Sequence, residues 1–190
     1  MDRMIEIRWH GRGGQGAKTA ALILAEAALK EGKYVQAFPE YGPERMGAPM
    51  QSFTRISEVP IKLHSHITNP SAVVVLDSTL LDMVDVTEGL PEEGIILVNT
   101  SRTSPQVREK LNFNRGKVYT VDATSISLSA LERNLPNIPM LGALIKATNL
   151  LKIETAVISI KEKMGKKFAS RIIEGNVEAL KRAYEEVKGE

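Results

Sequence analysis

The chain has no cysteine among its 190 residues. This absence excludes disulfide bonds, a cysteine nucleophile, and any cysteine-ligated iron–sulfur cluster or structural zinc in this chain. Histidine is almost as scarce, since His10, His64 and His66 are the only imidazoles. A chain without cysteine but with many lysines and glutamates is compatible with a thermophilic or anaerobic source.

The chain also lacks a strong excess of charge and a long apolar run. Lys and Arg number 25 against 23 Asp and Glu, a net charge of +2, which argues against nucleic-acid binding through phosphate neutralisation. No apolar run approaches the roughly 20 residues that span a bilayer. The charged N-terminal stretch MDRMIEIRWH lacks the apolar segment of a signal peptide. We therefore expect a cytoplasmic protein with no nucleic-acid or membrane partner.

Apolar residues make up 43% of the chain, enough for the core of one domain spanning residues 1–190. They recur at strand or helix spacing along most of it. Strands are predicted at 5–10, 34–38, 71–77, 94–100 and 117–121, and helices at 17–31, 80–84, 104–111, 123–134, 139–150, 154–164 and 168–188. This order predicts an α/β three-layer sandwich with a mostly parallel, Rossmann-like sheet, closed by a helical C-terminal region.

Several local signals refine this prediction. Residues 50–56 and 59–63 flank Ser57 and Glu58, which suggests a hairpin at a sheet edge, where Pro60 is tolerated. Ser104 and Pro105 are typical of an N-cap and the first helical position. Asn137 is predicted to cap the helix that follows it.

Four glycines within six residues follow the first predicted strand. The segment consists of Gly11, Arg12, Gly13, Gly14, Gln15 and Gly16. It satisfies the spacing G-x-G-x-x-G, and an alanine-rich helix begins directly after it. Such a turn exposes backbone N–H groups at a helix N-terminus, where a phosphate, a carboxylate or a partner's backbone can approach closely.

Two nucleotide-binding motifs match this loop incompletely. A dinucleotide fold requires an acidic residue at the end of the second strand, whereas residues 34–38 are followed by Pro39 and only then by Glu40. The sequence also does not match a phosphate-binding loop of the Walker type, in which lysine directly follows the last glycine, because Ala17 separates Gly16 from Lys18. NAD or FAD binding therefore remains an alternative, beside a turn shaped for structure or for protein contact.

A second unusual loop, residues 40–49, presents polar and apolar side chains on a proline-rich backbone. The candidate contact residues in it are Tyr41, Glu44, Arg45 and Met46. Because this loop and the glycine loop both follow strands, they are expected to open on the same rim of the sheet, where α/β proteins place their sites. We interpret the rim as an interface with a partner protein.

The remaining candidates have simple structural explanations. His64 and His66 would share a face on a strand, but two imidazoles without a third ligand do not define a metal site, so we predict none. Asp77 ends a buried strand and could be catalytic, yet the adjacent Ser78 and Thr79 favour a capping role. The sequence thus shows no self-sufficient catalytic apparatus.

The two loops together resemble a known family. IRWHGRGGQGAKTAA followed by FPEYGPERMGAPMQSFTRIS is similar to the gamma subunits of pyruvate:ferredoxin oxidoreductases, or pyruvate synthases, within the 2-oxoacid:ferredoxin oxidoreductases. The resemblance extends from residue 4 to about residue 185. The first motif is shared with related 2-oxoacid and indolepyruvate enzymes, and the second makes the resemblance more specific.

The resemblance implies a four-subunit enzyme that oxidatively decarboxylates pyruvate with coenzyme A to acetyl-CoA, CO2 and reduced ferredoxin. It implies that thiamine diphosphate and magnesium lie on the alpha and beta subunits, and that [4Fe-4S] clusters lie on the beta and delta subunits. This chain would then bind no cofactor alone and act as a non-redox, structural or site-capping subunit. Its partners would be the alpha, beta and delta subunits, with ferredoxin as the electron acceptor of the complex.

Three questions stay open at the level of sequence. The substrate could be another 2-oxoacid, such as 2-oxoisovalerate or indolepyruvate, and one gamma subunit could serve more than one enzyme. The glycine loop, residues 11–16, could contact coenzyme A or only a partner subunit. The chain could also be an independent nucleotide-binding oxidoreductase with a Rossmann-like fold.

Overall fold

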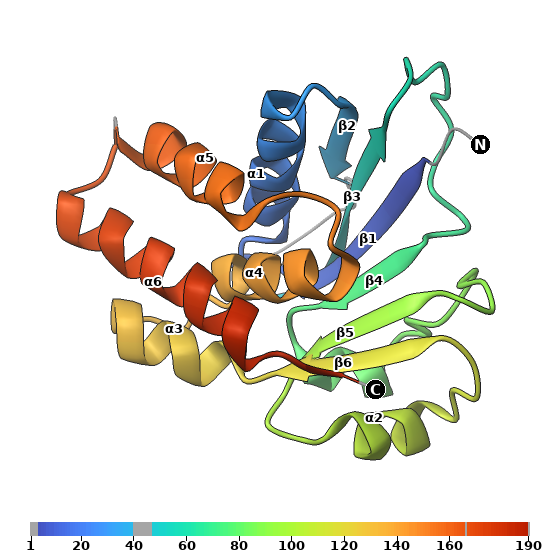
Figure 1. Ribbon diagram of the computed structural model, residues 1–190. Coiled ribbons are helices and arrows are strands. Elements are labelled where there is room, and N and C mark those ends of the chain that lie inside the picture. The colour runs from blue at the N-terminus through green and yellow to red at the C-terminus, as the bar shows by residue number, and fades with distance from the viewer. Residues whose placement is uncertain (1–3, 40–46, 166, 190) are drawn as a thin grey trace.

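A seven-stranded sheet with strand order β2-β3-β1-β4-β5-β6-β7 organises the chain (Figure 1). The structure, a computed structural model, describes residues 4–39, 47–165 and 167–189. The strands are β1 (Ile5–Arg12), β2 (Tyr34–Pro39), β3 (Pro49–Ser57), β4 (Ala72–Val75), β5 (Ile95–Asn99), β6 (Lys117–Val121) and β7 (Lys188–Gly189). The helices are α1 (Ala17–Lys30), the short 3-10 helix η1 (Ser78–Asp82), α2 (Ser104–Leu111), α3 (Ala123–Leu131), α4 (Asn137–Thr148), α5 (Ile153–Gly165) and α6 (Ser170–Glu186). Within these ranges no helix is both long and apolar enough to cross a membrane.

Most strands point in the same direction. β4 pairs in parallel with β1 and with β5, and β5 pairs in parallel with β6. β3 is antiparallel to both β1 and β2, so β2 runs in the direction of β1, while β7 is antiparallel to β6. The carboxyl ends of β1, β2, β4, β5 and β6 therefore meet at one edge of the sheet, as the predicted Rossmann-like arrangement requires.

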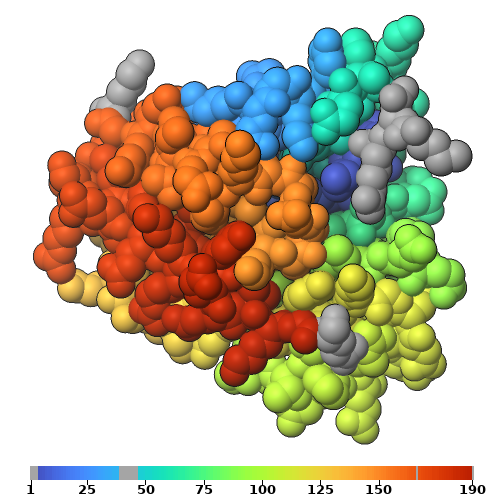
Figure 2. All heavy atoms as spheres, viewed as in Figure 1, coloured from blue at the N-terminus to red at the C-terminus, as the bar shows by residue number. Residues whose placement is uncertain are grey.

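Helices cover both faces of the sheet. On one face, α1, α3, α4, α5 and α6 pack with Trp9 and Val74 in the larger core, and on the other, η1 and α2 pack with Val73 and Val75 in a smaller one. Consecutive residues of β4 thus enter different cores, which explains its continuous apolar sequence. Figure 2 shows the C-terminal helices, in orange and red, over much of the first face. The predicted three-layer α/β sandwich is confirmed.

The predicted edge hairpin is wrong. Residues 49–57 form β3, which lies between β1 and β2 and is buried from Ser52 to Ser57. Residues 59–63 form no strand, and Pro60 lacks the N–H that a ladder would need. One partner of β3 is the preceding strand β2, and the other, β1, is distant in sequence. Pairing on both edges satisfies more of the backbone of β3 than a hairpin would.

Two caps also differ from the prediction. Thr103, not Ser104, is the N-cap of α2, and it forms a capping box with Gln106. Asn137 is the first residue of α4 and provides no side-chain cap, because its carboxamide lies against Gly16 instead. At the C-terminus, the predicted helix 168–188 divides into α6 and the short strand β7.

Candidate functional site

The topology directs attention to the carboxyl ends of β1 and β4. From β1 the chain passes through α1 on one face of the sheet, whereas from β4 it passes through η1 on the other. The crevice between such divergent connections is where open α/β sheets bind their ligands. The glycine loop, residues 11–16, lies at the end of β1 and therefore at this point.

The backbone of the glycine loop requires glycine at two positions. Gly14 and Gly16 have φ angles of +98° and +82°, in the left-handed region that side chains disfavour. The N–H of Gly13 donates to Ala48 O at 2.9 Å, and the N–H of Gly47 donates to Gly13 O at 3.1 Å. The described end of the second loop thus lies against the glycine loop, which confirms for residues 47–49 that the two loops share a rim.

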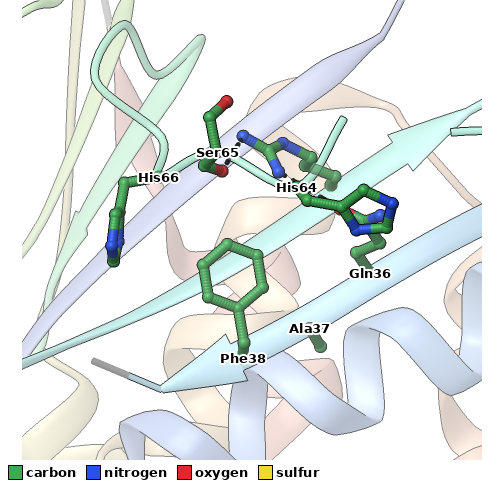
Figure 3. A pocket seen from close by; sticks show the side chains of 7 residues that line it. Gln36, Ala37, Phe38, His64, Ser65 and His66 are labelled. Atoms are coloured by element: carbon green, nitrogen blue, oxygen red, sulfur yellow. Dashed lines mark hydrogen bonds between the residues drawn. The ribbon is translucent and has the colours of Figure 1, made fainter. Parts of the chain in front are cut away.

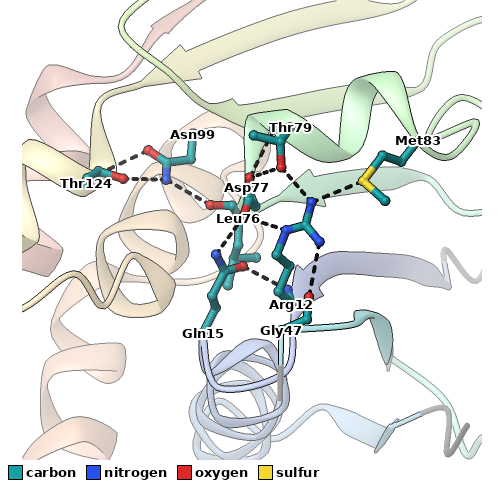
Figure 4. Close-up of polar contacts among 9 residues, drawn as sticks. All are labelled: Arg12, Gln15, Gly47, Leu76, Asp77, Thr79, Met83, Asn99 and Thr124. Carbon is teal, nitrogen blue, oxygen red and sulfur yellow. Dashed lines mark hydrogen bonds and ion pairs between the residues drawn. The ribbon is translucent and has the colours of Figure 1, made fainter. Parts of the chain in front are cut away.

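The Arg12 side chain turns toward η1 and connects the two loops (Figure 4). Its Nε donates to Asp77 Oδ2 at 3.1 Å, and its Nη1 donates to Gly47 O at 3.1 Å. Its Nη2 donates to Thr79 Oγ1 at 2.8 Å and contacts Met83 Sδ at 3.1 Å. The guanidinium is therefore occupied by this chain's own groups.

Asp77 is the acceptor at the centre of this network. Its Oδ1 caps η1 by accepting from the Thr79 N–H at 3.0 Å and from Thr79 Oγ1 at 2.6 Å, so the predicted capping role is confirmed. Its Oδ2 accepts from Gln15 Nε2 at 2.8 Å as well as from Arg12. Burial alone would raise the pKa of Asp77, but the hydrogen bonds from Thr79 and Gln15 and the charge of Arg12 lower it below its usual value. Asp77 is therefore a carboxylate at neutral pH, and it fixes both side chains of the glycine loop.

A polar cavity of about 270 Å3 continues from Asp77 along the carboxyl ends of β5 and β6. Asn99 lies in its wall, where Nδ2 donates to Leu76 O at 2.8 Å and to Thr124 Oγ1 at 2.9 Å. Oδ1 of Asn99 accepts from the Thr124 N–H at 3.2 Å. Because these groups satisfy one another, the cavity is a preorganised polar surface beside the glycine loop.

Sequence reasoning missed a buried basic pair on β1. Arg8 and His10 are 5% and 2% exposed, although the alternation in β1 places them opposite the apolar Ile7 and Trp9. Arg8 Nε donates to His10 Nε2 at 3.0 Å, and Arg8 Nη2 donates to Val86 O at 3.1 Å and Glu88 O at 2.7 Å. Burial and the charge of Arg8 lower the pKa of His10 to about 3. His10 is therefore a neutral acceptor that helps hold the segment after η1.

Of the other predicted residues, the structure describes only His64 and His66. Tyr41, Glu44, Arg45 and Met46 lie outside the described residues. His64 and His66 lie on irregular chain beside a cavity of about 360 Å3 at the end of the sheet, next to β2. Figure 3 shows that the two imidazole rings do not point toward one another.

The chain does not offer the ligands of an iron–sulfur cluster, and its described residues form no metal site. Among the residues that the structure describes, no three histidine or acidic side chains are grouped to hold a metal ion. The whole sequence lacks the cysteines that an iron–sulfur cluster requires. No catalytic step can be derived through such a group on this chain.

The fold and the site define a doubly wound α/β protein with a glycine-rich rim that its own hydrogen bonds hold in place. The model of the pyruvate ferredoxin/flavodoxin oxidoreductase family matches residues 6–186. The chain belongs to this family.

Relatives from two thermophiles and one solved structure agree with this assignment. The chain is 53% identical over 186 residues to the pyruvate synthase subunit PorC of Thermotoga maritima, covering 98% of this chain and 96% of that protein. It is 52% identical to the pyruvate/ketoisovalerate oxidoreductases common subunit gamma of Pyrococcus furiosus, over 97% and 98% of the two chains. The crystal structure of the Thermotoga maritima subunit superposes with a TM-score of 0.87, at 51% identity and 98% coverage of both chains.

Proposed function

We propose that this chain is the gamma subunit of a multi-subunit pyruvate:ferredoxin oxidoreductase. The complex oxidatively decarboxylates pyruvate with coenzyme A to acetyl-CoA, CO2 and reduced ferredoxin. The proposal rests on sequence identity: over 97% or more of its length, this chain is 53% identical to a pyruvate synthase subunit and 52% identical to a common gamma subunit. The lack of cysteine supports the division of labour, because the redox centres must then lie on other chains.

The proposed partners are the alpha, beta and delta subunits, with thiamine diphosphate, magnesium and [4Fe-4S] clusters on those chains. Ferredoxin accepts the electrons, and the complex works in the cytoplasm, where its metabolite substrates are found. Some relatives are named as a common subunit of pyruvate and ketoisovalerate oxidoreductases. These names favour a second role, in which the same subunit also serves a 2-oxoisovalerate enzyme.

The rim formed by residues 11–16 and 40–49 is the proposed contact with the catalytic subunits. The network around Asp77 and the two bonds of Gly13 to residues 47–48 fix the described part of the rim. A fixed surface loses little conformational freedom on association. Tyr41 and Arg45 are of residue types enriched in interface cores, so replacing either with alanine should weaken assembly or turnover.

The glycine loop is also proposed to reach coenzyme A when the subunit closes over the active site. Arg12 is held by Asp77 and Gly47, and the N–H groups of Arg12, Gly13 and Gln15 donate within the chain. A phosphate of coenzyme A would therefore meet the N–H groups of Gly14 and Gly16. In the intact complex, Arg12→Ala removes the side chain that ties the loop to Asp77 and Gly47. It should therefore raise the KM for coenzyme A and leave that for pyruvate unchanged. Unchanged values for both would leave the loop a contact to a partner subunit only.

Affinity purification of the tagged chain from its own cells tests the assignment. Mass spectrometry should find three co-purifying chains, of which two are rich in cysteine, in a complex that reduces ferredoxin with pyruvate and coenzyme A. Adding 2-oxoisovalerate to the same preparations tests the shared role. A chain that purifies alone with a bound dinucleotide would support an independent oxidoreductase and contradict the proposal.

A further inference from the structure

One edge of the sheet is long and unprotected. β2 is the last strand on its side, and in the described part of the chain it pairs only with β3. Natural proteins protect such edges with charged side chains, prolines or very short strands. The opposite edge follows this rule, since β7 consists of Lys188 and Gly189 alone, whereas residues 34–38 of β2 carry neither a charge nor a proline. β2 is therefore an edge that another strand can extend.

The strand registers show which backbone groups of β2 face outward. In an antiparallel pair, residues that exchange hydrogen bonds alternate with residues whose N–H and C=O point away from the partner. Leu76, which follows β4, donates its N–H to His10 O at 2.8 Å, so the even-numbered residues of β1 face β4 and the odd-numbered ones face β3. Followed through β3, the registers leave the N–H and C=O of Val35 and Ala37 at the free edge. Within residues 4–39, 47–165 and 167–189 these four groups have no hydrogen-bond partner.

The cavity of about 360 Å3 adjoins this edge on the face of the sheet away from α1. Val35 packs against the larger core on the α1 side, so Gln36 and Phe38 point to the opposite face, where they line the cavity. Figure 3 shows the Phe38 ring pointing from β2 toward residues 64–66, and the ring stacks on Phe53 with centroids 5.4 Å apart. A strand added to β2 would place every second side chain over this aromatic floor. The cavity therefore suits an apolar side chain of such a strand.

The chain around the cavity favours an acidic partner. Residues 59–70 contain one lysine and two histidines, all of them exposed, but no acid. The neighbouring acids are occupied, since Glu6 pairs with Arg55 at 2.6 Å and Glu58 pairs with Lys33 at 3.3 Å. Opposite charges across an interface select and orient the partner. An added strand with an acidic residue would thus be complementary to this end of the sheet.

The free edge is continuous with the rim (residues 11–16 and 40–49) that is proposed to contact the catalytic subunits. β2 ends at Pro39, directly before the rim residues begin, and β3, which pairs along the whole of β2, starts inside the rim at Pro49. A subunit that binds the rim therefore lies within reach of β2. A second copy of this chain would compete with that subunit for the space beside the rim, so the continuity favours a segment of the partner subunit.

We propose that an extended segment of a partner subunit adds to β2 as an eighth strand of the sheet. Its main chain forms hydrogen bonds with the N–H and C=O groups of Val35 and Ala37, as in other cases of strand addition. An apolar side chain of the segment lies over Phe38 in the cavity, and an acidic side chain lies beside Lys62. The inference rests on the proposed function for the existence of the partner subunit, and it adds a strand-pairing contact to the rim.

Hydrogen exchange at residue resolution, on the isolated chain and on the native complex, tests the pairing without any variant. The amides of Val35 and Ala37 should exchange at least tenfold more slowly in the complex. The amides of Gln36 and Phe38, which face β3 in both samples, should be slow in both. Equal rates for Val35 and Ala37 in the two samples would overturn the inference and leave the proposed function intact. A chain that purifies without partners would contradict the proposed function and the inference together.

Two variants at one position separate strand addition from simple contact. Ala37→Pro removes an N–H that points outward, and proline is tolerated at such a position of an edge strand, whereas Ala37→Ser keeps the N–H. Ala37→Pro should raise the concentration at which half of the complex is assembled at least tenfold, measured by mass photometry on serial dilution. Ala37→Ser should assemble as the wild type, and both isolated variants should unfold near the wild-type temperature. Equal assembly of the two variants would refute strand addition.

Charge reversal and cross-linking test the chemistry and the identity of the segment. Lys62→Glu should weaken assembly about three- to tenfold, whereas Lys117→Glu, at an exposed lysine on β6, should not; equal effects would exclude an acidic residue beside Lys62. Leu63 is 47% exposed, and its carbonyl accepts from Gln36 Nε2 at 2.9 Å, so a photoreactive p-benzoylphenylalanine in its place reports on the neighbour of β2. Cross-links in the native complex should reach a partner segment with apolar and acidic residues. Cross-links to a second copy of this chain would overturn the inference.

Discussion

Removing the carboxylate of Asp77 should release the glycine loop. Asp77 accepts hydrogen bonds from Arg12 at 3.1 Å, from Gln15 at 2.8 Å, and from the N–H and hydroxyl of Thr79 at 3.0 and 2.6 Å. A hydrogen bond to a charged group contributes about 1.5–3 kcal/mol, but the Asp77 side chain is 18% exposed and that of Arg12 24%, so water replaces part of what is lost. We expect Asp77→Ala to lower the free energy of unfolding by about 2–3 kcal/mol, and Asp77→Asn by about 1–2 kcal/mol, because an amide keeps one acceptor.

The chain offers a matched control and a convenient probe. Asp85 makes the same local turn as Asp77, accepting from the Thr87 N–H at 2.9 Å and its hydroxyl at 2.6 Å, but the structure shows no contact of it with the glycine loop. Asp85→Ala should therefore cost only about 1 kcal/mol. Urea unfolding can be followed by the fluorescence of Trp9, the single tryptophan, which is fully buried on β1.

Hydrogen exchange locates the effect. The amide of Gly13 donates to Ala48 O and that of Gln15 to Arg12 O, and both should exchange faster in Asp77→Ala but not in Asp85→Ala. Because the pKa of Asp77 is lowered in the folded chain, its stabilisation is complete at neutral pH and is lost as the pH falls through about 4 and below. The stability difference between wild type and Asp77→Asn should shrink over that range. If both alanine variants cost the same and loop exchange stayed at the wild-type rate, Asp77 would not hold the loop.

Three further predictions follow from other parts of the chain. Because the pKa of His10 is lowered to about 3, the unfolded chain binds a proton below pH 6.5 that the folded chain does not, and acidification from pH 6.5 to 5 should lower the free energy of unfolding by about 2 kcal/mol. His10→Gln should flatten this pH dependence in urea titrations. An unchanged slope would show that His10 is not buried as a neutral group. Gly16→Ala should lower the free energy of unfolding by about 2 kcal/mol, because the added Cβ clashes with Asn137 at a residue whose φ is +82°. Gly32→Ala should lower it by about 1 kcal/mol, because Gly32 has a similar φ of +80° but no atom within 4 Å of the added Cβ. Equal losses of stability in thermal unfolding would exclude the clash. The isolated chain should be colourless, contain no iron by metal analysis and oxidise no 2-oxoacid, because it has no cysteine; dye reduction by the pure subunit would contradict the proposed function.

The sequence alone determined the local elements and the class of fold. The apolar runs at 71–77 and 94–100 contain the buried strands β4 and β5, because a strand covered on both faces must be apolar throughout. The glycine loop was evident because the φ angles that it adopts strongly favour glycine. Asp77 was predicted as a cap because its partner Thr79 is only two residues away.

Only the tertiary structure decided the features that join distant segments. Residues 49–57 became an inner strand because β1, which is distant in the sequence, pairs with the edge that β2 leaves free. Arg8 became buried because Val86 and Glu88, about 80 positions away, supply acceptors, and His10 accepts from Arg8. Asp77 meets Arg12 across 65 residues. No local pattern encodes such contacts, since they depend on which backbone groups packing leaves within hydrogen-bond reach.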